Sequence, residues 1–227
     1  MVNSLYNDLS KTLAAQGVAL RGGFHPSPED EIPVAGEGHP TQTLLLVGNT
    51  GPDLWPHFAA HMDGTGDALD RWTVETMTPI AARFGARCVF PFDKPFQPFQ
   101  RWAMRAEAVR PSPLGVLMHP DHGLWHAYRA ALLFSETLDL PAHDDRPSPC
   151  ETCAGKPCLS ACPVGAFSGE SYDVPACAAY LVSPEGSECR DGGCRARDAC
   201  PIASDRRYVP DQIRFHMSAF KRSVCGA

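Results

Sequence analysis

Cysteine is the residue type that most clearly indicates chemistry in this chain of 227 residues, because eight of its ten cysteines fall between residues 150 and 200. These eight are Cys150, Cys153, Cys158, Cys162, Cys177, Cys189, Cys194 and Cys200. The first residues lack the basic start and apolar stretch of a secretory signal, so we expect a cytoplasmic chain. Without export, so many thiols favour metal binding or catalysis over disulfides.

The spacing of the thiols predicts two clusters. The first group reads Cys-x2-Cys-x4-Cys-x3-Cys-Pro and resembles the bacterial ferredoxin run, in which three thiolates hold one cluster and the fourth holds another. The second group again has four cysteines and a final Cys-Pro. We therefore predict two 4Fe-4S clusters. Several intervals are longer than in the usual run, and the alternatives are two structural zinc sites, one cluster with spare thiols, or unligated thiols.

A second candidate site is the segment from His119 to Arg129. Asp121 lies in a predicted turn and could donate a proton in a reductive step, although a turn aspartate is normally a turn former. Trp125 starts an apolar strand, where a tryptophan is usually part of the core. Arg129 lies inside that strand and needs an anionic or hydrogen-bonding partner, which could also be a structural carboxylate.

The elements that carry these residues follow from hydrophobic periodicity. A helix is predicted where Val2, Leu5, Leu9 and Leu13 recur, and another over 68–84. Strands are predicted at 43–48, 87–90, 115–118 and 125–134, the last two placed around a turn at 120–123. This order predicts an α+β domain with a mixed sheet over residues 1–143.

Residues 144–227 are predicted to form a separate module. The polar, proline-rich stretch 144–149 is a hinge, and the cysteine region after it has few apolar residues. Such a segment is not expected to have a core of its own, so it should need cross-links. The net charge of −6 argues against a general nucleic-acid or anionic-membrane binder, and no apolar run is long enough to cross a bilayer.

The cysteine module resembles that of the epoxyqueuosine reductases. The resemblance rests on Cys177-x2-Tyr180-Leu181 after the first Cys-Pro, followed by Cys189, Cys194 and Cys200-Pro201. It implies that one cluster is held by Cys150, Cys153, Cys158 and Cys200, and the other by Cys162, Cys177, Cys189 and Cys194. The helical repeat region that engages tRNA in those reductases has no counterpart here, so the tRNA substrate is not expected.

The amino-terminal part resembles the CblC-type cobalamin-processing proteins. The resemblance rests on His119-Pro120-x2-Gly123-x-Trp125-x3-Arg129. It implies a nitroreductase-like fold that binds cobalamin without a lower axial ligand from the protein, with Arg129 beside the cofactor. It also makes His119, Gly123 and Trp125 candidate cofactor contacts. The candidate catalytic residues of this segment are Asp121 and His119.

Together these patterns predict an iron–sulfur and cobalamin-dependent oxidoreductase, with a ferredoxin-like dicluster module that passes electrons to a corrinoid. The expected partners are an electron donor, such as a flavodoxin or a reductase, and a small-molecule or corrinoid substrate. The alternative is a ferredoxin-type electron carrier whose amino-terminal domain binds a flavin or a partner protein.

Overall fold

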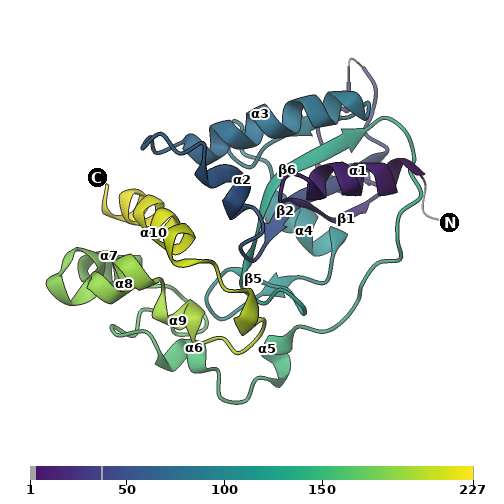
Figure 1. The fold of residues 1–227 in the computed structure, drawn as a ribbon. Helices are drawn as coiled ribbons and strands as arrows, with labels where there is room; N and C mark the ends of the chain where they lie inside the picture. The colour runs from purple at the N-terminus through teal and green to yellow at the C-terminus, as the bar shows by residue number, and fades with distance from the viewer. Residues whose placement is uncertain (1–3, 37, 227) are drawn as a thin grey trace. The chain divides into compact units, whose positions relative to one another are not determined.

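The computed structural model describes residues 4–36 and 38–226, which form two compact units (Figure 1). The first unit comprises the described residues of Met1–Ala108 together with His126–Asp145, and the second comprises those of Val109–Trp125 with Arg146–Ala227. The predicted boundary at 143/144 lies next to the division after Asp145. The segment Val109–Trp125, however, groups with the second unit rather than with its neighbours in the sequence.

The first unit is an α+β arrangement built on a four-stranded sheet of order β1-β2-β6-β3. Every strand pair in this sheet is antiparallel, so the predicted mixed sheet is wrong. The elements of this unit are α1 (Ser4–Ala14), β1 (Ala19–Phe24), η1 (Pro28–Asp30), β2 (Thr43–Thr50), α2 (Trp55–Ala59), α3 (Ala68–Arg83), β3 (Arg87–Val89), α4 (Phe99–Ala106) and β6 (His126–Phe134).

Strand β2 lies at the centre of the core. Every residue from Thr43 to Asn49 is buried, and alternate residues of a strand point to opposite faces, so both faces of the sheet are covered here. Helix α3 contacts β3 and β6, whereas α1 and α4 contact β1. Within the described ranges, no helix has the length and hydrophobicity needed to cross a membrane.

The helices at 68–84 and near residues 5–13 agree with the periodicity, although Val2 lies outside the described residues. Strand β1 was missed because Gly22 and Gly23 resemble a loop; its pairing with β2 is irregular between Leu20 and Gly23. The expected pairing of 115–118 with 125–134 around one turn is also wrong. Strand β5 pairs with β4, and β6 belongs to the large sheet.

The second unit consists of short elements around a small apolar core. Leu114, Met118, Leu124, Ala196 and Cys200 are its buried members. The segment before the predicted boundary supplies the three large apolar side chains, so the cysteine region packs against a core that it does not provide alone. The elements are β4 (Arg110–Pro111), β5 (Leu117–Met118), α5 (Pro149–Thr152), α6 (Pro157–Ser160), α7 (Val174–Val182), η2 (Pro184–Gly186), α8 (Ser187–Gly192), α9 (Arg195–Asp198), η3 (Ser204–Arg206) and α10 (Pro210–Cys225).

Gly48 tests the close approach of β2 and β6. A Cβ atom on Gly48 would lie 2.1 Å from the carbonyl oxygen of Ala127, so Gly48→Ala forces the two strands apart. We expect the substitution to lower the free energy of unfolding by about 1–3 kcal/mol in urea denaturation followed by circular dichroism. Gly36→Ala, where an added Cβ meets nothing within 4 Å, is the control and should change it by less than about 0.5 kcal/mol. Equal effects of the two substitutions would contradict this packing.

Candidate functional site

Two cavities of the second unit are each lined by four cysteines. The smaller cavity has a volume of about 20 Å³, and its thiols are those of Cys150, Cys153, Cys158 and Cys200. The larger cavity has a volume of about 250 Å³, and its thiols are those of Cys162, Cys177, Cys189 and Cys194. The structure thus separates the eight cysteines into the two sets that the resemblance implied.

Local structure explains how the first set is positioned. Ser148 begins α5 with a capping box: its hydroxyl accepts a hydrogen bond from the backbone N–H of Cys150 at 3.3 Å, and Glu151 accepts one from the backbone N–H of Ser148 at 3.3 Å. Pro157 starts α6, which places Cys158 in the first turn of that helix. The short helices therefore fix two of the four thiols.

The second set depends on helix starts and one glycine. Asp173 caps α7 by accepting a hydrogen bond from the backbone N–H of Ala176 at 2.9 Å, which puts Cys177 in the first turn. Gly193 has a φ of +98°, which favours glycine, and it links α8 to α9. Cys189 and Cys194, on either side of this link, line the same cavity.

The sulfurs of the second set lie near hydrogen-bond donors. The backbone N–H of Ala166 donates to the Sγ atom of Cys162 at 3.3 Å. Burial raises the pKa values of Cys177 and Cys194, and the Tyr172 hydroxyl and the backbone N–H groups of Arg197 and Ala196, respectively, act in the opposite direction. Such donors stabilise negative charge on sulfur, as metal-bound thiolates require.

All ten cysteines lie in the described part of the chain and carry free thiols. Burial raises the pKa of five of the thiols that line the two cavities, namely Cys150, Cys158, Cys177, Cys194 and Cys200. These thiols therefore keep their protons near neutral pH unless a cation stabilises the thiolate. Among the described residues, no group of three or more His, Cys, Asp or Glu side chains is placed to hold a metal ion. The thiols line the walls of two cavities instead. Cys88, outside both cavities, has its pKa raised to about 12 by burial.

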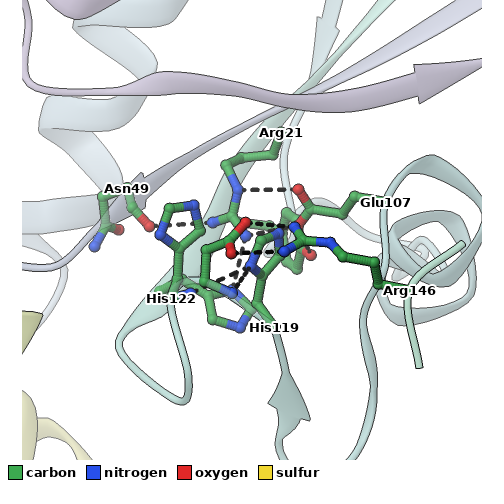
Figure 2. Close-up of polar contacts among 9 residues, drawn as sticks. Arg21, Asn49, Glu107, His119, His122 and Arg146 are labelled. Atoms are coloured by element: carbon green, nitrogen blue, oxygen red, sulfur yellow. Dashed lines mark hydrogen bonds and ion pairs between the residues drawn. The ribbon is translucent and has the colours of Figure 1, made fainter. Parts of the chain in front are cut away.

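The turn that follows β5 is organised by His119, which is buried with 6% exposure. Its Nδ1 atom accepts hydrogen bonds from the backbone N–H groups of Asp121 at 3.0 Å and His122 at 3.2 Å, so its proton lies on Nε2 (Figure 2). Gly123 closes the turn with a φ of +56°, and a Cβ there would lie 2.4 Å from the carbonyl oxygen of Ile202. Within the second unit both residues therefore have structural roles.

Asp121 forms a two-pronged ion pair with Arg146, whose Nη1 and Nη2 atoms lie 2.8 and 2.5 Å from its two carboxylate oxygens (Figure 2). The hydrogen bonds and the charge of Arg146 lower the pKa of Asp121. An ionised carboxylate donates no proton, so a catalytic role for Asp121 requires this contact to open.

Trp125 is buried with 3% exposure, as expected for a strand tryptophan. The Arg197 guanidinium lies 4.4 Å from the centre of its ring and 4.8 Å from that of Tyr208. Arg197 also donates to the carbonyl oxygen of Leu124 through Nε at 3.2 Å and Nη2 at 2.5 Å. These contacts tie the end of the 119–125 segment to α9 within the second unit.

Arg129 belongs to the first unit and is the extra residue of a β-bulge. Val47 pairs with Ala130 and Gly48 with Tyr128, which leaves Arg129 without an opposite residue on β2. Bulges of this kind redirect a side chain and are common beside functional sites. Burial raises the pKa of Asp70, and the positive charge of Arg129 acts in the opposite direction, so Asp70 is a structural carboxylate near this arginine.

A buried ion pair in the first unit was not predicted. Arg21, with 2% exposure, donates to Glu107 through Nε at 3.2 Å and Nη2 at 2.6 Å, and through Nη1 to the carbonyl oxygen of Asn49 at 3.3 Å (Figure 2). The Tyr128 hydroxyl donates to Glu107, and the Nη2 atom of Arg21 lies 3.2 Å from the Nδ1 atom of His126. Burial raises the pKa of Glu107. In the sequence, the only sign of this pair is that Arg21 directly precedes Gly22 and Gly23.

The predicted pocket residues divide between the two units. His119, Asp121, Gly123 and Trp125 belong to the second unit, and Arg129 belongs to the first. Within the second unit, the structure brings the first four together on one short segment, near Arg146 and Arg197.

No protein-family model matches the chain, and no curated protein sequence matches it. Three solved structures resemble it. The B12-trafficking protein CblC of C. elegans, a homologue of human MMACHC, has a TM-score of 0.55 at 15% identity, over 96% of this chain and 95% of that one. An epoxyqueuosine reductase has a TM-score of 0.46 at 14% identity, over 77% of this chain and 52% of that one. A reductive dehalogenase from a study of B12-dependent dehalogenation has a TM-score of 0.46 at 16% identity, over 92% of this chain and 33% of that one.

The fold is therefore a CblC-like α+β fold with a four-stranded antiparallel sheet. At this level of identity the likeness establishes the fold alone. The chain spans about half (52%) of the epoxyqueuosine reductase it resembles.

The Arg21–Glu107 pair makes a stability prediction. Arg21→Met leaves the Glu107 carboxylate buried without its cation, so we expect it to lower the free energy of unfolding by about 3–5 kcal/mol. Urea denaturation at neutral pH measures the change. The control is Arg71→Met, which removes exposed pairs with Asp63 and Asp67 and should cost about 0–1 kcal/mol. A loss for Arg21→Met no larger than for the control would show that the buried pair is not needed.

Proposed function

We propose that this chain is an iron–sulfur redox protein with two 4Fe-4S clusters in its second unit and a corrinoid bound through its first unit. The observation that carries the proposal is the division of eight cysteines into two cavities, four to each. Four thiolates are the ligand number of a 4Fe-4S cluster. The doubled Cys-Pro ending supports the same assignment.

The donor sets fit clusters better than zinc. A tetrahedral zinc site requires four ligand atoms within about 2.0–2.3 Å of a single centre. The thiolates of a 4Fe-4S cluster bind four different iron atoms, so they surround a volume rather than one point. Thiols that line the walls of a cavity match the second requirement.

Bound clusters would supply one-electron transfer. The residues of this chain would hold the sulfurs, stabilise their charge and limit contact with water. The amide donor of Ala166 serves the second purpose, and the apolar core around Leu114 and Met118 serves the third. The electron donor is proposed to be a flavodoxin or a reductase.

The corrinoid part of the proposal is supported by the CblC-like fold, because that relative is a B12-trafficking protein. A bound corrinoid would supply reductive cobalt chemistry. In the first unit, the bulge turns Arg129 out of the regular pairing of β6, and a half-buried guanidinium suits an anionic or amide-bearing ligand. We propose that Arg129 contacts the corrinoid or its cosubstrate.

Metal and sulfide analysis of anaerobically reconstituted protein tests the clusters. We expect about eight iron ions and eight sulfide ions per chain, with a broad absorption band in the blue region of the visible spectrum. Cys162→Ser removes one thiol of the second set only and should lower both counts to about four. Cys88→Ser, which changes a thiol outside both cavities, should leave them unchanged. Two zinc ions and no sulfide would overturn the proposal.

Cobalamin titration of the reconstituted protein tests the corrinoid site. We expect saturable binding by absorption spectroscopy and calorimetry, and about 10- to 100-fold weaker binding for Arg129→Met, the value of one charge-assisted hydrogen bond. The control is Arg83→Met, which removes a cation at the end of α3 instead. If both clusters assemble but cobalamin gives no spectral shift and no heat, the protein is an electron carrier that uses a flavin or a partner protein.

A further inference from the structure

The interval between Cys153 and Cys158 is two residues longer than in the bacterial ferredoxin run. Its end, Gly155-Lys156-Pro157, leads into α6, and Lys156 is the N-cap residue of that helix. The backbone carbonyl oxygen of Lys156 accepts a hydrogen bond from the backbone N–H of Leu159 at 2.9 Å. Lys156 therefore belongs to the start of the helix whose first turn carries Cys158.

The backbone of Lys156 adopts a conformation that favours glycine. Its φ is +34° and its ψ is +59°, in the left-handed region that residues with a side chain rarely occupy. Such strain persists only where the surrounding structure holds it in place, and it is concentrated at functional sites. The chain thus keeps a lysine at a position where a glycine would remove the strain.

Lys156 also lines the smaller cavity together with the four thiols of the first set. Among the residues that line this cavity, all of them in the described part of the chain, only Lys156 is an Asp, Glu, His, Lys or Arg. Lys156 is exposed, and no hydrogen bond or ion pair joins its ammonium group to another of the described residues. Its charge is therefore not neutralised by a neighbouring carboxylate.

The electrostatics of the first set agree with this placement. Burial raises the pKa of Cys150 and of Cys158, and the positive charge of Lys156 acts in the opposite direction on both. These two cysteines lie on different helices, α5 and α6, so the charge acts on the first set from more than one side.

We propose that Lys156 is a positioning residue that raises the reduction potential of the first cluster by holding a positive charge at the wall of its cavity. This inference rests on the proposed function. One-electron reduction makes the cluster and its four thiolates more negative, and no bond forms or breaks. A fixed cation stabilises the reduced state more than the oxidised state, so the potential rises.

Lys156→Met is the direct test, because it removes the charge and keeps a long, unbranched side chain. The reconstituted protein is titrated with dithionite, and each cluster is followed by electron paramagnetic resonance. Cys162→Ser, which leaves the first set intact, identifies the signal of the first cluster. At a fixed potential, we expect the ratio of reduced to oxidised first cluster to fall about three- to tenfold, with no change for the second cluster.

Three further measurements separate charge from backbone strain. Lys156→Arg keeps the charge and should retain the original potential. Lys156→Gly removes the charge and also relieves the strain, so it should shift the potential as Lys156→Met does, and it carries the test if Lys156→Met loses the cluster. Because Lys156 is exposed, the shift should shrink at about 1 M potassium chloride, where charges are screened within a few ångströms.

Lys221→Met is the matched control, because Lys221 lies in α10 and lines neither thiol cavity. It should move neither potential. Unchanged potentials in Lys156→Met with both clusters present, or equal shifts in Lys156→Met and Lys221→Met, would overturn the inference alone. Loss of the first cluster in every Lys156 variant, Lys156→Arg included, would overturn it as well. If the unaltered protein binds no iron and sulfide, the proposed function itself fails.

Discussion

The second unit depends on the packing of cysteines against a core too small to hold it alone. Most of its helices have only four to six residues, whereas isolated helices need about 12–15 to be even marginally stable. Cys150, Cys158, Cys162 and Cys194 pack against the buried cluster of Leu114, Met118 and Leu124. Bound clusters would add the cross-links that such short elements lack, so binding and folding are expected to be coupled here.

The first unit is stabilised differently, by a sheet buried on both faces and by one buried ion pair. Strand β6 combines these features, because Tyr128 donates to Glu107 and the next residue, Arg129, is the extra residue of the bulge. The Arg21–Glu107 pair thus fixes the strand directly beside the irregularity. Rigid support next to a redirected side chain is what a binding residue requires.

Part of the candidate site could be predicted from the sequence. The resemblance to the epoxyqueuosine reductases implied the division of the cysteines into two sets, and the place of Trp125 at the start of an apolar run predicted its burial. Long-range packing was not visible. The role of Leu114 and Met118 in the second core, the partner of Arg21 and the antiparallel pairing throughout the sheet all join residues far apart in the chain. Asp121 looked like a proton donor because Arg146, its partner, lies 25 positions away.

Native mass spectrometry of the protein isolated without oxygen tests the central claim most directly, because it weighs the intact chain with whatever it holds. We predict one dominant species that is heavier than the chain by the mass of two 4Fe-4S clusters. Substitution of Cys150 or Cys177 should each remove the mass of one cluster. A chain that carries zinc ions, or nothing, would contradict the division of the eight thiols between two clusters.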